Sequence, residues 1–333
     1  MLQTTLDLLH DSIKYTKTKY STGTNMFSYT RLSQQPSSFR NLSGISVSEF
    51  DDLFRRFIPV WENNEAKRLD RKDRKRVIGG GRHYALELHD LLLMTLIWLH
   101  LYLTVETIGF LFDVHKSSVS RDTRRVILAL RQLGEDSLWF SEQPTPTQRR
   151  NLAQALTDFP DLLSVLDVTE TNIERPQDAA QRQAHYSGKK KTFTRKTGLI
   201  VNEQGQIRGL TASYPGCMHD LTVFRSSGLL PTLPLQSVKV GDKGFEGLDK
   251  DLPNHSIAIP HKTHYKHPLD EAEKWANRDV AAQRIVVENT ICELKHFKVL
   301  VDRFRQPWQL LDDAFCAIVA LINPRIACRA LPL

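Results

Sequence analysis

The second half of the chain carries a fixed order of short apolar runs, which constrains the fold more than any other sequence feature. The runs are separated by Gly and Asn, and they cover residues 162–168, 192–201, 207–213, 237–240 and 256–259. Helical patterns follow the third run, at residues 220–227, and the fifth run, at residues 279–300. The turn at residues 202–205 fits a hairpin between the second and third runs. This order of three strands, a helix, two strands and a long helix predicts an α/β domain.

Length and composition place this domain in a larger soluble protein. A chain of 333 residues is long enough for about two domains. With 41% hydrophobic and 25% charged residues, it is neither wholly disordered nor collagen-like. The four cysteines lack a CxxC spacing, and no signal peptide or membrane span is visible, so we expect a cytoplasmic protein, associated with the nucleoid if bacterial. The net charge of +7 favours an acidic polymer as partner.

Three segments are expected along the chain. Residues 1–43 are rich in Ser, Thr, Tyr and Gln, which predicts a loosely ordered arm. Residues 44–145 form a helical domain, with a first helix that ends at Pro59 and a buried helix at residues 91–103. The basic run at residues 67–76 is either a linker or a segment that contacts phosphates. Pro144 to Thr147 mark the boundary, and residues 146–333 form the second domain. A short helix is expected over residues 148–159, crossing between the domains.

A helix-turn-helix is predicted near the end of the helical domain. Residues 104–112 form a short helix, residues 113–116 the turn, and residues 117–130 a second helix that begins with a Ser cap. One face of this second helix is apolar, with Val119, Val126, Ile127 and Leu130. The opposite face carries the residues expected to contact DNA, which are Ser117, Ser118, Arg121, Arg124 and Arg125. An ordinary surface helix is the alternative, because the turn lacks a glycine.

Acidic residues stand at the ends of two of the apolar runs. Asp167 and Asp242 each follow a buried strand, where a carboxylate is costly unless it is paired or binds a metal. Each could instead be a turn residue at a strand end. On the long helix, Arg284, Glu288 and Lys295 share one polar stripe. Glu288 is therefore either an ion-pair partner of Arg284 or a metal ligand that faces the sheet.

Five segments in this order resemble the DDE superfamily of transposases. They begin at Asp167, Tyr186, Pro215, Gly241 and Arg284, and read DVTETNIERP, YSGKKK, PGCMHD, GDKGF and RIVVE, with Lys295 after the last. The resemblance covers about residues 167–305 and is greatest to the Harbinger-like branch and to bacterial insertion-sequence family five. It implies a ribonuclease H-like fold, with a mixed five-stranded sheet and helices, preceded by the helix-turn-helix domain.

The resemblance also implies a function. The catalytic and metal-binding acids are Asp167, Asp242 and Glu288, while Asp220 is a rival for the second acid, or an N-cap, or a residue that supports the ligands. Two divalent ions are expected, Mg²⁺ with Mn²⁺ as an alternative. Further DNA contacts are expected from Lys189, Lys190, Lys191, Arg195, Arg284 and Lys295, although the three consecutive lysines could equally be a solvated strand end.

The implied partners are double-stranded transposon ends and target DNA, bound by a homo-oligomer that assembles on DNA, with no membrane partner. The implied function is cleavage at terminal inverted repeats and joining of the 3′ hydroxyl ends to target DNA. A sequence-specific DNA-binding protein derived from a transposase is the first alternative. A metal-dependent hydrolase that acts on another phosphodiester is the second.

Overall fold

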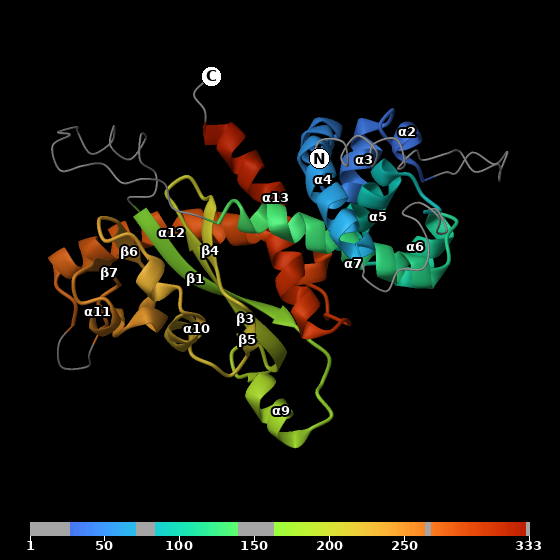
Figure 1. Cartoon of the computed structure of the whole chain (residues 1–333). Coiled ribbons are helices and arrows are strands. Elements are labelled where there is room, and N and C mark those ends of the chain that lie inside the picture. The colour runs from blue at the N-terminus through green and yellow to red at the C-terminus, as the bar shows by residue number, and fades with distance from the viewer. Residues whose placement is uncertain (1–26, 71–83, 139–162, 264–267, 331–333) are drawn as a thin grey trace. The chain divides into compact units, whose positions relative to one another are not determined.

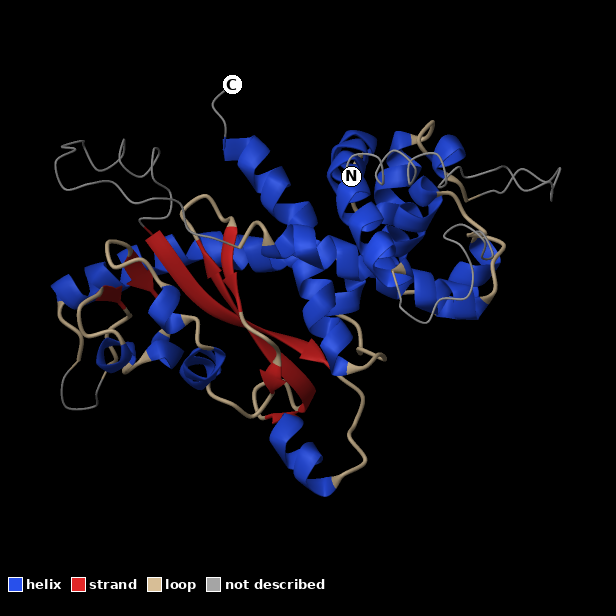
Figure 2. Ribbon diagram, viewed as in Figure 1, coloured by secondary structure: helices blue, strands red, loops and turns tan. Residues whose placement is uncertain are grey.

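The computed structural model describes residues 27–70, 84–138, 163–263 and 268–330 (Figures 1 and 2). It divides into two compact units, residues 1–130 and residues 131–333, and each unit is described by itself. No helix in the described ranges combines the length and apolar character needed to span a bilayer. The predicted boundary at residues 144–147, the predicted helix at 148–159 and most of the basic run at 67–76 lie outside the described residues.

The described residues of the first unit form helices and the segments that connect them. Its helices are α2 (Tyr29–Leu32), α3 (Pro36–Ser43), α4 (Val47–Leu69), α5 (Leu88–Leu101), α6 (Val105–Leu111) and the greater part of α7 (Lys116–Glu135). The apolar helix α5 supplies the centre of the core, because every side chain from Leu91 to Leu99 is buried. This confirms the predicted buried helix. Phe39, Phe50 and Phe57 pack into the same core and are fully buried.

The loosely ordered arm predicted over residues 1–43 is wrong for its last part. Residues 29–43 contain α2 and α3, and residues 1–26 lie outside the described residues. Helix α3 begins with Pro36 and ends at Gly44, whose φ of 80° is left-handed and suits glycine. Its Phe39 ring lies 5.4 Å from that of Phe50, edge to face. Tertiary packing of one aromatic side chain therefore stabilises a polar segment as a helix.

Helix α4 also differs from expectation, because it continues through Pro59 to Leu69. Its N-terminus is closed by a reciprocal capping box between Ser46 and Glu49. The buried face that starts with Phe50 and Leu53 extends past the proline to Trp61. Burial of this face outweighs the one backbone hydrogen bond that the proline removes.

The second unit is built on one mixed sheet. Its strands are β1 (Leu163–Asn172), β2 (Tyr186–Ser187), β3 (Thr192–Val201), β4 (Ile207–Leu210), β5 (Tyr214–Pro215), β6 (Val238–Val240) and β7 (Ser256–Ala258). Strand β1 pairs antiparallel with β3 and parallel with β6, β6 pairs parallel with β7, and β4 pairs antiparallel with β3. The order β4-β3-β1-β6-β7 is the mixed five-stranded arrangement that the sequence predicts. The two-residue strands β2 and β5 were not expected; both pair with β3.

Helices cover both faces of this sheet (Figure 1). Leu166 and Ile200 belong to a core cluster with side chains of α10 (Asp220–Ser227) and α11 (Leu248–Asp251). Helix α12 (Glu271–Leu294) contacts β1, β3 and β6, and α13 (Trp308–Ala330) contacts β4. A further helix, α9 (Ala179–His185), packs on β3. The arrangement agrees with the ribonuclease H-like fold.

The end of α7 belongs to the second unit and packs closely against α13. Arg131 Nη1 donates to Asp313 Oδ1 at 2.6 Å. At Gly134 the two backbones come so close that a Cβ atom would lie 1.9 Å from the carbonyl oxygen of Cys316. Only glycine fits at this position.

We expect Gly134→Ala to destabilise the second unit by about 3 kcal/mol, because the clash is with backbone and α13 must shift. Thermal and urea unfolding of the full chain would measure this loss. Gly188→Ala is the matched control, since a Cβ there meets nothing within 4 Å. Equal unfolding midpoints for both variants would contradict the described packing.

Strand β6 buries a lysine. Lys239 is fully buried, and its Nζ donates to the carbonyl oxygens of Pro234 and Ser237, the latter at 2.7 Å. Burial lowers the pKa of Lys239 from 10.5 to about 8. Between these two values the folded chain holds less of this proton than the unfolded chain, so stability rises with pH.

We therefore expect the free energy of unfolding to increase by on the order of 2 kcal/mol as the pH rises from about 8 to about 10. Lys239→Met should lose this part of the pH dependence. The exposed Lys250 supplies the control, and Lys250→Met should keep it. A pH profile that Lys239→Met leaves unchanged would show that Lys239 keeps its proton throughout this range.

Candidate functional site

Two acids meet at one edge of the sheet because their strands are parallel. Val165 of β1 pairs with Val240 of β6 in the last parallel pair. Asp167 and Asp242 each follow two residues later, so they occupy equivalent positions beyond that pair. Asp242 ends the extended segment and accepts a hydrogen bond from the backbone N–H of Gly244 at 2.8 Å. The expectation that the two strand-end acids lie together agrees with this register.

The carboxyl group of Asp167 is shielded from water and lies beside other carboxylates. Its side chain is 16% exposed, and its Oδ1 accepts from the backbone N–H of Val168 at 2.7 Å. Burial raises the pKa of Asp167, and the negative charges of Asp242 and Asp220 raise it further, against the hydrogen bond from Val168 and the charge of Arg284. Asp167 is therefore above all a buried carboxyl group with other acids as neighbours.

Asp220 lies in this cluster as the first residue of α10. It is not the N-cap, because His219 occupies that position. Its Oδ1 accepts from Lys196 Nζ at 2.8 Å. A Cβ atom on Gly244 would lie 2.9 Å from Asp242 Oδ1 and 3.3 Å from Asp220 Oδ2, so both carboxylates face this glycine. Asp220 thus joins the acid cluster while Lys196 compensates its charge.

Glu288 reaches the cluster through an arginine. Arg284 Nη2 lies 3.7 Å from Asp167 Oδ2 and 3.7 Å from Glu288 Oε1, and Arg284 Nε has no hydrogen-bond partner within the described ranges. The Glu288 side chain is 57% exposed. The contact with Arg284 agrees with the first alternative for Glu288, an ion pair. The second alternative, a metal ligand that faces the sheet, stays a prediction.

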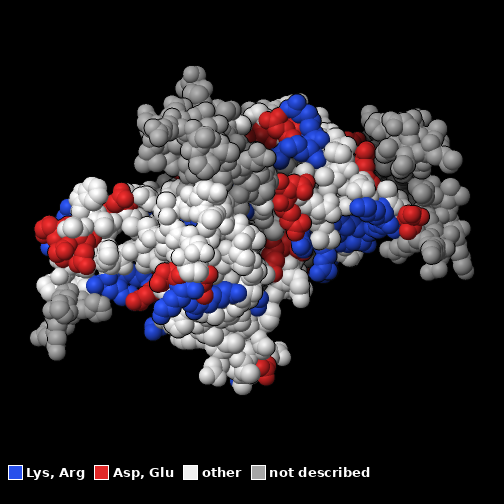
Figure 3. Space-filling model, turned by 60° about the vertical axis from the view of Figure 1, so that its left-hand side comes forward, with Lys and Arg blue, Asp and Glu red and all other residues white. Residues whose placement is uncertain are grey.

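Lysines border the acids. Burial lowers the pKa of Lys295, and the charge of Lys190 lowers it further, while the charges of Asp167 and Glu170 oppose this. The interaction with Lys190 shows that the exposed turn containing Lys189 and Lys191 lies close to Lys295. Lys191 has a left-handed φ of 54°. Lys and Arg side chains gather in separate patches on the face shown in Figure 3.

The donor atoms suit a hard divalent cation, but the ligand set is not preassembled. Carboxylate oxygens are what Mg²⁺ prefers, and the mutual repulsion of Asp167 and Asp242 is the environment that a cation relieves. Among the residues that the structure describes, no three His, Cys, Asp or Glu side chains are placed to enclose one ion. The guanidinium of Arg284 separates Glu288 from Asp167. Asp167 and Asp242 thus have the donor atoms that a cation would need, whereas Glu288 is in contact with Arg284.

Arg195 does not have the surroundings of a phosphate contact. Its Nε donates to Ser213 Oγ at 2.9 Å, and its Nη1 lies 3.0 Å from His185 Nε2. The guanidinium stacks over the ring of Trp308, 4.6 Å from the centroid. Burial lowers the pKa of Arg195. Arg195 therefore has a packing role in the structure, which the sequence could not reveal because Trp308 and Ser213 are distant in the chain, and its DNA contact stays a prediction.

In the first unit, the predicted helix-turn-helix corresponds to α6 and α7. The expected apolar face of α7 is confirmed, because Val119, Val126, Ile127 and Leu130 are fully buried. The predicted Ser cap is wrong: α7 begins at Lys116, and His115 Nδ1 accepts from the backbone N–H of Ser117 at 3.3 Å. The exposed stripe of α7 contains Ser117, Ser120, Arg121, Arg124 and Leu128.

The turn between the two helices needs no glycine of its own. Asp113 adopts the left-handed conformation, with a φ of 52°, which Asp tolerates better than most residues. The glycine that the motif requires lies inside α6 instead. A Cβ atom on Gly109 would lie 2.6 Å from the carbonyl oxygen of Val114. The apparent lack of a turn glycine is thus explained by these two residues.

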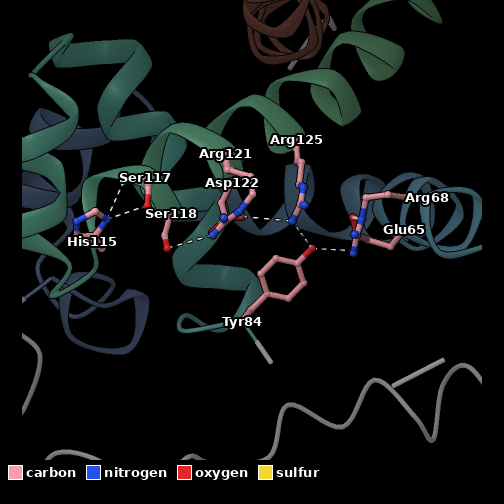
Figure 4. Close-up of polar contacts among 9 residues, drawn as sticks. All are labelled: Glu65, Arg68, Tyr84, His115, Ser117, Ser118, Arg121, Asp122 and Arg125. Atoms are coloured by element: carbon pink, nitrogen blue, oxygen red, sulfur yellow. Dashed lines mark hydrogen bonds and ion pairs between the residues drawn. The ribbon is translucent and has the colours of Figure 1, made fainter. Parts of the chain in front are cut away.

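A polar network ties α7 to the rest of the first unit (Figure 4). Tyr84 Oη donates to Glu65 Oε2 at 2.7 Å and accepts from Arg125 Nη1 at 3.1 Å. Arg125 Nη1 also lies 3.4 Å from Asp122 Oδ1. Of the five predicted DNA-contacting residues on α7, Arg125 is therefore bound to Tyr84 outside its own helix, and Tyr84, Glu65 and Asp122 were not foreseen. The sequence gives little indication that these residues contact Arg125, because Glu65 and Tyr84 lie before the helix-turn-helix motif.

Comparisons with known proteins agree with both sites. Residues 166–323 match the family model described as DDE superfamily endonuclease, and residues 84–136 match the helix-turn-helix of DDE superfamily endonuclease. The chain is 26% identical over 293 residues, 88% of this chain and 95% of the relative, to a protein named probable transposase for insertion sequence element IS702, from Microchaete diplosiphon. No solved structure matches the chain significantly.

The ranges that the two family models match contain the two sites. One covers the ribonuclease H-like unit with Asp167 on β1, Asp242 after β6 and Glu288 on α12, and the other covers α6 and α7. Together they span more than half of the 333 residues. The chain belongs to the DDE superfamily of endonucleases and carries the helix-turn-helix domain of that superfamily.

Proposed function

We propose that the chain is a transposase that binds terminal inverted repeats through its helix-turn-helix and cleaves and joins DNA with Asp167, Asp242 and Glu288. The observation that carries the proposal is the parallel register of β1 and β6, which sets Asp167 and Asp242 side by side next to Arg284 and Glu288. The named relative supports it. The assignment to the Harbinger-like branch stays a prediction, as does an oligomer on DNA.

The reaction requires that negative charge on the attacking and leaving oxygens of a phosphodiester be stabilised. In the first step, water attacks the phosphorus at the end of the element and a 3′ hydroxyl leaves. In the second step, that hydroxyl attacks a phosphodiester of target DNA. Divalent ions bound by the three carboxylates, Mg²⁺ or Mn²⁺ and two in number, would supply the activation of the attacking oxygen and the stabilisation of the leaving one.

The protein's own groups would hold the substrate. Asp167 and Asp242 have to remain ionised, and Arg284 favours this for Asp167 by its positive charge. Lys295 and the lysines at residues 189–191 lie where backbone phosphates beside the acids could be bound. Displacement of Arg284 by a phosphate contact would free Glu288 to join the other two acids.

Replacing an acid by its neutral amide should remove DNA cleavage. We expect Asp167→Asn, Asp242→Asn and Glu288→Gln each to reduce nicking of repeat-ended DNA in Mg²⁺ by more than about 100-fold, while DNA binding persists. The exposed Glu271, on the same helix as Glu288, gives the control Glu271→Gln, which should cleave normally. Wild-type binding without any metal-dependent nicking would favour the alternative of a DNA-binding protein that lacks transposition activity.

Neutralising the bordering lysines should weaken DNA binding in a salt-dependent way. The slope of log affinity against log salt is negative, and Lys190→Gln and Lys295→Gln should each make it less steep by about 0.9, because each removes one phosphate contact. Filter binding of the full chain over a salt series measures the slope. Lys250→Gln serves as the control for an exposed lysine of α11. Slopes equal to that of the wild type would show that DNA phosphates do not bind at Lys190 and Lys295.

A further inference from the structure

The arginines at the start of α7 differ in what surrounds them. Arg124 is exposed and has no ion-pair partner in the described part of the chain. The Arg121 side chain is 54% exposed, and its Nη2 donates to Ser118 Oγ at 3.1 Å. Arg125 is 27% exposed, and its guanidinium extends toward the hydroxyl group of Tyr84 (Figure 4). These surroundings predict different roles for three residues that look alike in the sequence.

Tyr84 connects Arg125 to α4. Its hydroxyl group lies between Glu65 and Arg125, accepting from the arginine and donating to the glutamate. Its ring packs at 5.9 Å from that of Trp61, four residues before Glu65 on α4. The guanidinium of Arg125 also lies 5.9 Å from the centroid of the Tyr84 ring. One side chain thus contacts both α4 and α7.

Glu65 is held in its ionised form on the other side of Tyr84. It is 7% exposed, and Arg68 binds it through Nε at 2.8 Å and Nη2 at 2.5 Å. Burial alone would raise the pKa of Glu65, but the hydrogen bonds from Arg68 and Tyr84 and the charges of Arg68 and Arg125 outweigh it and lower that pKa. Glu65, bound by Arg68, thus anchors the Tyr84 hydroxyl group to which Arg125 donates.

Asp122 completes the surroundings of Arg125 from α7 itself. This carboxylate is 7% exposed, and its Oδ1 lies 3.4 Å from Arg125 Nη1 and 3.5 Å from Arg121 Nε. Moving Arg125 to a phosphate would remove a donor from the Tyr84 hydroxyl group and would leave Asp122 with its contact to Arg121. Loss of a hydrogen-bond or ion-pair partner of a buried group is costly.

We propose that Arg125 is a positioning residue that Tyr84, Glu65 and Asp122 hold in place, so that α7 presents Arg121 and Arg124 to DNA. The proposal rests on the proposed DNA-binding function of the helix-turn-helix and assigns the tasks of the residues within it. Arg125 fixes the orientation of α7 relative to α4 and does not contact DNA. Arg121 and Arg124 lie on the exposed stripe with Ser117 and reach base edges and phosphates.

Lysine substitution separates the two roles that Arg125 could have. A lysine keeps the positive charge that a phosphate needs, but it lacks the planar guanidinium that bonds Tyr84 and Asp122 together. A positioning role therefore predicts that Arg125→Lys binds DNA about as poorly as Arg125→Gln. A phosphate contact predicts that Arg125→Lys binds nearly as well as the wild type.

The experiment uses the full chain and a duplex that the wild-type chain selects from a random-sequence library. We expect Arg125→Gln, Arg125→Lys and Tyr84→Phe each to bind this duplex roughly tenfold more weakly with an unchanged salt slope. The Tyr84→Phe, Arg125→Gln double variant should lose no more than Arg125→Gln alone, because both act through one contact. Arg124→Gln should instead lower the salt slope by about 0.9 or relax the sequence preference at one base pair.

Rescue by Arg125→Lys, together with a slope lowered by about 0.9 in Arg125→Gln, would overturn the proposal. Additive losses in the double variant would also overturn it. Thermal unfolding of each variant controls for folding, and Tyr84→Phe keeps the aromatic packing against Trp61. If the wild-type chain bound no duplex even at low salt, the proposed function itself would fail, which is a different result from either of these.

Discussion

The parallel pairing of β1 with β6 is the interaction on which the catalytic arrangement depends. Three backbone pairs, ending at Val165 and Val240, fix the register of these strands. Slipping this register would separate Asp167 from Asp242 along the sheet edge. The surrounding side chains stabilise the register, since Ser164 Oγ lies 3.0 Å from Ser237 Oγ and Leu166 packs into the cluster with Phe224 and Phe245. The apolar sheet therefore holds together two carboxylates that repel each other.

The direct contacts of the carboxylates distinguish the two sites. In the acid cluster, Asp167 Oδ2 lies 3.7 Å from Arg284 Nη2, burial raises the pKa of Asp167, and the charges of Asp242 and Asp220 raise it further. In the network of the first unit, hydrogen bonds from Arg68 and Tyr84 help to lower the pKa of Glu65, whereas burial raises the pKa of Asp122 despite its arginine partners. A carboxylate beside other carboxylates suits binding of cations, whereas carboxylates held by arginine and tyrosine suit a fixed geometry. The same residue types can thus serve chemistry in one place and rigidity in the other.

The sequence predicted the parts that depend on local patterns. The succession of strands along the chain, the hairpin, the buried helix α5 and the apolar face of α7 follow from periodicity, and the structure confirms them. The mixed sheet itself was implied by the family resemblance. The sequence could not predict contacts between distant residues, which enclose Arg195 against Trp308 and Arg125 against Tyr84. It also missed α3 and the continuation of α4 past Pro59, because tertiary burial of Phe39 and Trp61 outweighed local signals. The shared stripe of Arg284 and Glu288 was found by helical spacing, but their contact with Asp167 required the fold.

The central claim is that Asp167, Asp242 and Glu288 converge on shared divalent cations. Crystals of the full chain grown with Mn²⁺ and a DNA duplex test it most directly, because anomalous scattering locates the metal without reference to the protein atoms. We expect anomalous density between Asp167 and Asp242, with Arg284 displaced and Glu288 turned toward it. Metal density elsewhere, with these three side chains still separated by Arg284, would contradict the account.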